Sequence, residues 1–157
     1  MGAIFQACLL GALALILVSA GIEDVRFRTI ANAKNTAVAL AAPLWWWASG
    51  MAPWPDVAIQ IGCAALVFAL FVGAFALGMM GGGDVKLIGA LALWLPLAPL
   101  LRMLVLMSLL GGALTLLMLV DSWIRRRGSA AIEVPYGVAI TLAALIILCE
   151  PILNRIG

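Results

Sequence analysis

Two aspartates are the first candidates for chemistry in this chain. There is no histidine, which excludes Ser-His and Cys-His nucleophile systems and histidine-based zinc proteases. Asp24 ends the first predicted span and Asp84 begins the fourth, so both are expected at the same membrane boundary. If the two segments touch, the carboxylates can share one proton, because like charges in close contact cannot both ionise. One carboxylate can then take a proton from water while the other, protonated, polarises a scissile carbonyl, as in an aspartyl protease.

A simpler role for these acids is that they end helices and meet lipid headgroups or nearby arginines. The glycines at 81–83, directly before Asp84, favour the catalytic interpretation. Each costs a helix about 1 kcal/mol relative to Ala, and close approach of a peptide is one reason for so permissive a backbone. Lys86 follows Asp84 by two residues, a spacing that does not face it on a helix, and is expected to reach the headgroups.

The elements that must position these acids are membrane helices. The chain has 157 residues, of which 66% are hydrophobic and only 10% charged. Since a span needs about 20 apolar residues, we expect an all-α integral membrane protein, a single domain over residues 1–157 that forms a bundle of six transmembrane helices. The apolar runs that predict the six spans are 3–20, 36–51, 57–80, 84–95, 101–120 and 136–149.

The basic residues predict the orientation of the bundle. Seven of the nine fall in the connections 23–35, 81–86 and 121–133, whereas Arg102 and Arg155 lie in the others. By the positive-inside rule, the N-terminus is outside and Asp24 and Asp84 lie at the cytoplasmic boundary. Five tryptophans near the outer helix ends are expected to form an interfacial aromatic belt. They are Trp45, Trp46, Trp47, Trp54 and Trp94.

Three motifs resemble those of type IV prepilin peptidases. Residues 24–32, DVRFRTIAN, resemble the family's D-x-R-x-R-x-I-P-N stretch after the first span, with Ala31 where proline is usual. Residues 81–87, GGGDVKL, resemble its G-x-G-D-x-K-L motif, and residues 135–137, PYG, its P-[FY]-G segment. The resemblance implies Asp24 and Asp84 as the catalytic pair. Glu23 has no counterpart in the motif, and since neighbouring helix positions point about 100° apart, it is assigned no catalytic role. The remaining motif residues are expected to shape the loop or contact substrate: Gly81, Gly83, Lys86, Pro135, Tyr136 and Gly137.

The resemblance also implies a substrate and a location. Members of this family remove the basic leader from type IV prepilins, Flp-type pilins or pseudopilins, typically after Gly and just before a hydrophobic helix. This places the protein in the bacterial inner membrane as a multi-pass enzyme, with the substrate and the bilayer as partners, contact with pilus assembly machinery possible, and no nucleic acid. The paired CxxC motifs of methylating members are absent, so the chain resembles the short Flp/Tad-type peptidases.

Other functions fit the composition less well. A small transporter could use two membrane-embedded carboxylates, but it would more naturally hold them near the bilayer midplane and often show duplicated halves. An assembly subunit would leave the paired acids and the glycine run unexplained. No metal or other cofactor is expected, because histidine is absent and the three cysteines, Cys8, Cys63 and Cys149, form no CxxC pair.

Overall fold

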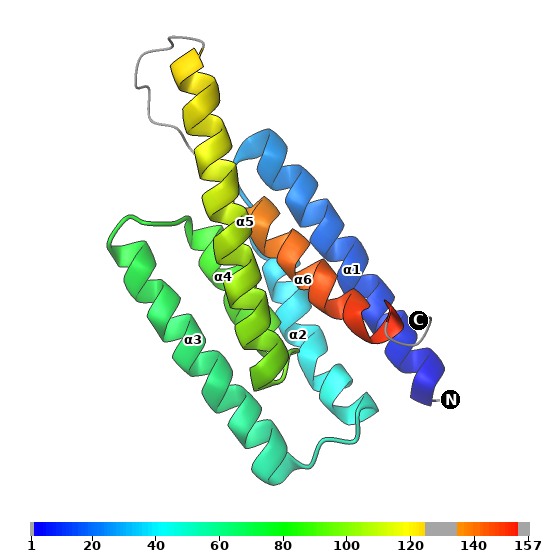
Figure 1. The fold of residues 1–157 in the computed structure, drawn as a ribbon. Coiled ribbons are helices and arrows are strands. Elements are labelled where there is room, and N and C mark those ends of the chain that lie inside the picture. Colours follow the sequence, from blue (N-terminus) through cyan, green and yellow to red (C-terminus); the bar gives the residue numbers. More distant parts are fainter. Residues whose placement is uncertain (1, 125–134, 154–157) are drawn as a thin grey trace.

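The computed structural model describes residues 2–124 and 135–153, and the side chains up to residue 150. Every regular element in these ranges is helical, which confirms the all-α prediction (Figure 1). A short helical turn, η1 (Pro53–Val57), leads into α3. The six helices are α1 (Gly2–Phe27), α2 (Asn32–Ala48), α3 (Ala58–Ala76), α4 (Gly82–Ala92), α5 (Leu97–Ile124) and α6 (Tyr136–Leu153).

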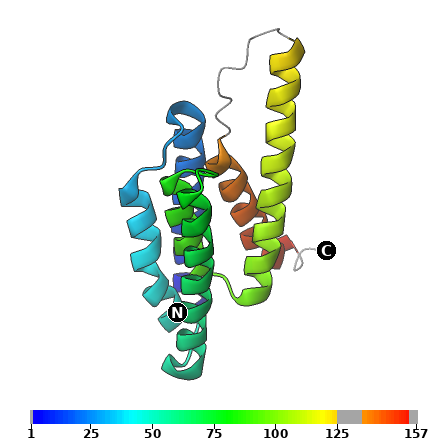
Figure 2. The same ribbon diagram turned by 90° about the vertical axis from the view of Figure 1, so that its left-hand side faces the viewer.

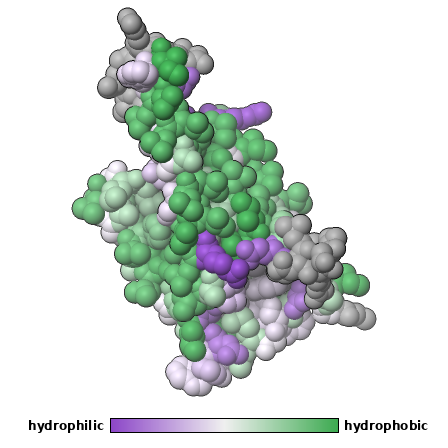
Figure 3. Space-filling view, viewed as in Figure 1, coloured by the Kyte–Doolittle hydropathy of each residue, from purple (hydrophilic) through white to green (hydrophobic). Residues whose placement is uncertain are grey.

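Three segments of the bundle are long and apolar enough to cross a membrane: Gly2–Phe27, Pro53–Ala76 and Leu97–Ile124. Large apolar side chains cover their outer surfaces, and much of the face seen in Figure 3 is hydrophobic. The helix in the fourth predicted span, α4, has 11 residues and rises about 16 Å, which is shorter than the hydrocarbon core of a bilayer. The membrane character is thus supported, and the count of six crossings stays a prediction.

Helix α4 lies inside the bundle, packed against α2, α3 and α6 (Figures 1 and 2). Its sequence is apolar nearly all round, a pattern that suits a helix surrounded by protein as well as one that faces lipid. Leu87, Ile88 and Leu91 are completely buried. Small residues let α3 approach closely, because a Cβ added at Gly89 would lie only 2.6 Å from a ring carbon of Phe68.

Side chains from α2, α3 and the turn after α4 fix the end of α4 that lies away from Asp84. The Gln60 amide donates hydrogen bonds of 2.7 Å to the carbonyl oxygens of Ala92 and Leu95, which have few partners at a helix end. The Trp94 indole donates a 2.8 Å bond to the Val38 carbonyl, and this side chain is only 4% exposed. The expectation that Trp94 belongs to an interfacial belt is therefore wrong, because its N–H bonds to α2 inside the bundle.

The helices alternate in direction, so that α1, α3 and α5 end, and α2, α4 and α6 begin, at one end of the molecule (upper end in Figure 1). We call this the site end, because Asp24 and Asp84 lie there. The third basic connection contributes Arg125, Arg126 and Arg127, which lie outside the described residues, as does Arg155. The predicted orientation is accordingly carried by the basic residues of the other connections.

Candidate active site

The carboxylate of Asp24 lies against the first turn of α6. Asp24 is in the last turn of α1 and is only 4% exposed. Its Oδ2 accepts a 3.1 Å hydrogen bond from the Val138 N–H, and the backbone of Gly137 bonds to it as well. The first N–H groups of a helix have no partner within the helix and favour negative charge. The start of α6 therefore holds and orients this acid.

Gly137 makes this contact possible because it has no side chain. A Cβ added there would lie 2.7 Å from Asp24 Cγ and 2.8 Å from Ile30 Cδ1, closer than real Cβ atoms come. Pro135 precedes the helix and its carbonyl accepts a bond from the Val138 N–H, 3.2 Å long. In the Pro-aromatic-Gly segment, the proline thus stands at the helix start and the glycine admits the carboxylate.

The aromatic residue of that segment, Tyr136, packs on α5. A Cβ added at Gly111 would lie 2.9 Å from Tyr136 Cε1, so the ring rests directly on the glycine. Tyr136 also lines a hollow of about 180 Å³ together with Met80 and Met107. The contact ties the start of α6 to α5, which supports the position of the N–H groups that hold Asp24.

Asp84 lies in the first turn of α4, at its third residue, and is 9% exposed. Its carboxylate is hydrogen-bonded to the backbone of Gly81, the residue that caps the helix. This bond is half of a capping box, so the simpler role as a helix-capping acid is realised here too. Asp84 lies within electrostatic range of Asp24, so the fold brings the acids of α1 and α4 into one region of the molecule.

Ile30 joins the two halves of the site. It is buried in the connection between α1 and α2. A Cβ added at Gly83 would lie 3.4 Å from Ile30 Cβ, and one added at Gly137 would meet the other end of the same side chain. Gly83 belongs to the helix rather than to a loop, so its contribution is to let Ile30 pack beside Asp84.

Two asparagines of α2 bind α4 near the acids. The Asn35 side chain is 4% exposed and donates a 3.0 Å bond from Nδ2 to the carbonyl of Gly83. The Lys86 ammonium donates a 2.8 Å bond to Asn32 Oδ1, so it links α4 to α2 in addition to any contact with headgroups. Asn35 was not among the predicted site residues. An amide directly before the second apolar run is the signal that could have pointed to it, because polar groups that enter the membrane need partners.

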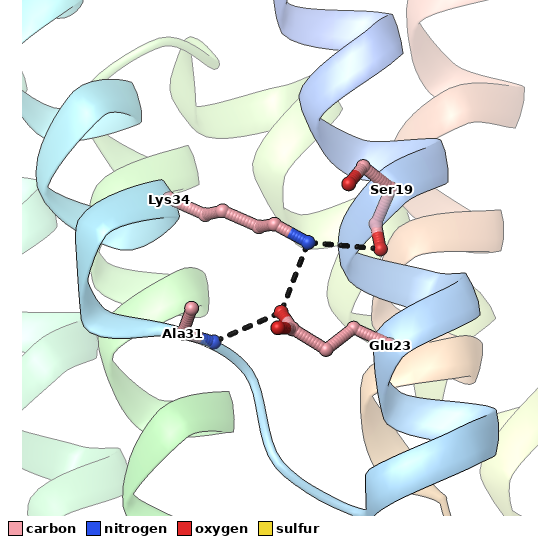
Figure 4. A network of polar contacts seen from close by, with 4 residues as sticks. All are labelled: Ser19, Glu23, Ala31 and Lys34. Atoms are coloured by element: carbon pink, nitrogen blue, oxygen red, sulfur yellow. Dashed lines mark hydrogen bonds and ion pairs between the residues drawn. The ribbon is translucent and has the colours of Figure 1, made fainter.

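Glu23 has a separate set of partners from Asp24 (Figure 4). Its Oε2 accepts a 3.1 Å bond from the Ala31 N–H and lies 2.9 Å from the Lys34 ammonium, which also donates to the Ser19 carbonyl. These contacts hold the connection between α1 and α2. The usual proline at position 31 would have no N–H to donate, so Ala31 and Glu23 form a bond that the family's common motif does not allow.

Within the described ranges, no three potential metal-ligating side chains lie together. The expectation that the protein needs no metal is not tested by this and stays a prediction. The family model of the type IV leader peptidase family matches residues 9–116, more than half of the chain. This range includes both aspartates and ends before Pro135. Searches of the curated proteins and of the solved structures found no match.

Proposed function

The chain belongs to the type IV leader peptidase family, and from this premise we propose that it removes the basic leader of type IV prepilins, Flp-type pilins or pseudopilins. The catalytic pair in this proposal is Asp24 and Asp84. One observation carries it: two buried aspartates from different helices lie at the same end of the bundle, where the charge of one acts on the other. Within the described part of the chain, Arg28 is near enough for its charge to act on Asp24, but no cationic side chain donates a hydrogen bond to either acid, and the pair can therefore share a proton.

The proposed reaction is hydrolysis by an activated water. The ionised carboxylate of the pair takes a proton from water, and the oxygen attacks the carbonyl carbon of the scissile peptide bond. The protonated carboxyl group gives its proton to the carbonyl oxygen, so a neutral tetrahedral intermediate forms. When the C–N bond breaks, the protonated carboxyl group gives its proton to the leaving nitrogen, and a hydroxyl of the intermediate gives its proton to the other carboxylate. The pair thereby returns to its starting state, with one proton shared between the two acids. The N–H groups of Gly137 and Val138 hold Asp24, and that of Gly81 holds Asp84, during these steps.

We place the site end at the cytoplasmic face of the bacterial inner membrane. The basic residues of its first two connections support this orientation, because such residues favour the cytoplasmic side. They are Arg26, Arg28, Lys34 and Lys86. In that orientation a basic leader stays in the cytoplasm while the hydrophobic segment after it lies in the bilayer, and the bond between them reaches the two aspartates.

The position of the acids argues against the transporter alternative. A transporter would hold its coupling residues near the middle of the bundle, within reach of both sides. Asp24 and Asp84 instead lie at helix termini on one side, where a peptide can approach from the aqueous phase.

The direct test is co-expression with a prepilin that carries a basic leader, followed by detection of leader removal as a shift in electrophoretic mobility. The wild-type chain is expected to process the prepilin, and membranes without the chain are not. Mass spectrometry of the product should place the new N-terminus immediately before the hydrophobic segment. An unprocessed prepilin beside normally inserted enzyme would reject the proposed function.

A further inference from the structure

An apolar groove opens between α2, α3 and α4, beside the proposed catalytic pair. It has a volume of about 540 Å³ and is lined mostly by apolar side chains, among them Ala39 of α2 and Ala65 of α3. Asn35 and Lys86 are among its few polar lining residues. The Asn35 amide is bonded to Gly83, the neighbour of Asp84, so the groove begins next to the site.

The groove runs from the site end into the body of the bundle. On α2 its lining extends from Asn32 to Leu40, a rise of about 12 Å, and along α4 from Lys86 to Leu93, the residue that follows the helix. It is therefore long enough for several residues of a peptide. A substrate peptide that entered at the site end would run along α4 into the bundle. This is the direction expected for the hydrophobic segment that follows the leader.

A buried acceptor lies at the start of the groove. Asn35 Oδ1 has no hydrogen-bond partner in the part of the chain that the structure describes. The residue is only 4% exposed, so water does not readily take the place of a partner. The Asn35 orientation is fixed, because Nδ2 must face the Gly83 carbonyl to donate to it. Oδ1 is therefore the atom left without a donor, and an unpaired buried acceptor is unfavourable.

A substrate whose backbone is extended at the cleaved bond has N–H donors that need acceptors. Its backbone N–H groups beyond that bond enter an apolar environment without partners, and each requires an acceptor. A lipid acyl chain in the groove would offer no donor and would leave Asn35 Oδ1 unpaired. The groove together with Asn35 therefore fits a peptide better than a lipid.

We infer that the groove between α2, α3 and α4 receives the apolar segment that follows the cleaved bond, and that Asn35 Oδ1 accepts a hydrogen bond from its backbone. This inference rests on the proposed function and assigns its substrate subsite. Asn35 is a positioning residue in this arrangement, because one amide would connect the substrate backbone to the Gly83 carbonyl beside Asp84.

The first experiment removes single N–H groups from the substrate. A synthetic peptide with a basic leader, a glycine before the cleaved bond and an apolar segment is cleaved in detergent micelles by the wild-type enzyme. Peptide bonds just after the cleaved one are replaced by esters, one at a time. We expect one ester to lower kcat/KM by about three- to tenfold, the effect of losing one hydrogen bond. In Asn35→Leu that same ester should cost nothing further, because the acceptor is already gone.

The second experiment fills the groove. Ala65→Leu adds a side chain to its wall on the outer surface of α3, and Ala69→Leu makes the same change on exposed α3 outside the groove lining. We expect Ala65→Leu to raise KM several-fold with little change in kcat, and Ala69→Leu to behave as wild type. Equal KM values for the two variants would overturn the assignment of the groove.

The outcomes distinguish a failure of this inference from a failure of the proposed function. If the wild-type enzyme cleaves no such peptide, the proposed function and the inference are both wrong. If it cleaves the parent peptide but no ester slows it, or if the sensitive ester loses equally in Asn35→Leu, only the role of Asn35 is wrong. The ester scan on the wild-type enzyme decides the matter even if Asn35→Leu does not fold.

Discussion

The Val138 N–H donates a 3.1 Å hydrogen bond to Asp24 Oδ2 and so joins two residues that are 114 positions apart in the sequence. The bond connects the last turn of α1 to the first turn of α6. It makes the geometry of one catalytic candidate depend on a helix outside the range matched by the family model. The Pro-Tyr-Gly segment before Val138 therefore belongs to the site in the structure as well as in the motif.

The first prediction concerns the aspartates themselves. Asp24→Asn and Asp84→Asn should each abolish prepilin cleavage, because an amide can neither activate water nor share the proton. An Asn side chain still offers an oxygen to the backbone N–H groups, so membrane insertion should survive. The double variant should lose no more than either single variant, as for residues that act as one unit.

The control for these variants is Asp56→Asn. Asp56 lies at the other end of the bundle and accepts a bond from the Ala52 N–H, which Asn can also accept. Its cleavage rate should match the wild type in the same co-expression assay. Near-normal processing by either Asp24→Asn or Asp84→Asn at equal expression would show that the pair is misassigned.

The second prediction concerns Gly137. In Gly137→Ala the new Cβ would meet Asp24 Cγ at 2.7 Å, so the start of α6 must move away from the carboxylate. Such overpacking typically costs about 1–3 kcal/mol, and it also breaks the bonds that orient Asp24. We expect at least a tenfold slower cleavage and a lower midpoint of thermal unfolding in detergent.

Gly112→Ala is the matched control, because a Cβ at Gly112 has no atom within 4 Å. Replacing a glycine inside a helix by alanine removes chain entropy from the unfolded state and should be neutral or slightly stabilising. Equal activity of the two alanine variants would mean that the close contact at Gly137 has no part in catalysis.

The two acids of the site could be predicted from the sequence, whereas the residues that pack around them could not. Asp24 and Asp84 stand out because ionisable groups at membrane depth are costly and because three glycines directly precede Asp84. That Ile30 lies between Gly83 and Gly137 is set by the path of the connection after α1, which no local pattern encodes. Trp94 was misassigned for a similar reason, since an indole near a helix end suits an interface equally well until its N–H is seen to bond Val38.

The course of α4 shows the same limit in the fold. An apolar run at 84–95 is compatible with a membrane span, and periodicity does not distinguish a lipid-facing helix from one enclosed by protein. The structure shows a short helix inside the bundle, whose far end is held by Gln60. A polar residue within the third run was available in the sequence, but its partners on α4 depend on packing between helices.

The third prediction tests the turn between α1 and α2 through Ala31. Its φ of −61° already suits proline, so Ala31→Pro should fit the backbone. The change gains stability from a stiffer unfolded chain but loses the N–H bond to Glu23, and we expect the two effects to be of similar size. In the wild type we expect almost no change in the unfolding midpoint.

In a Glu23→Ala background the bond is already absent, so Ala31→Pro should raise the midpoint. Thermal unfolding of the four variants in detergent measures this cycle. Identical effects of Ala31→Pro in both backgrounds would contradict the role given to Glu23. Cleavage by Glu23→Gln should stay near wild type, because glutamine keeps the acceptor and a solvent-screened ion pair such as that with Lys34 contributes little to stability.

The last prediction concerns which side of the membrane holds the site end. Seven of nine basic residues lie in connections assigned to this end, and each Lys or Arg favours the cytoplasmic side. Cysteines introduced singly for labelling in intact cells can report the side, in a chain whose own Cys8, Cys63 and Cys149 are replaced by alanine. Phe27→Cys, at the exposed end of α1 near Asp24, should be protected from a membrane-impermeant maleimide. Trp54→Cys, exposed at the opposite end, should react, and both should react after the membrane is permeabilised. The reverse pattern would place Asp24 and Asp84 on the outer side, where a leader that stays in the cytoplasm could not reach them.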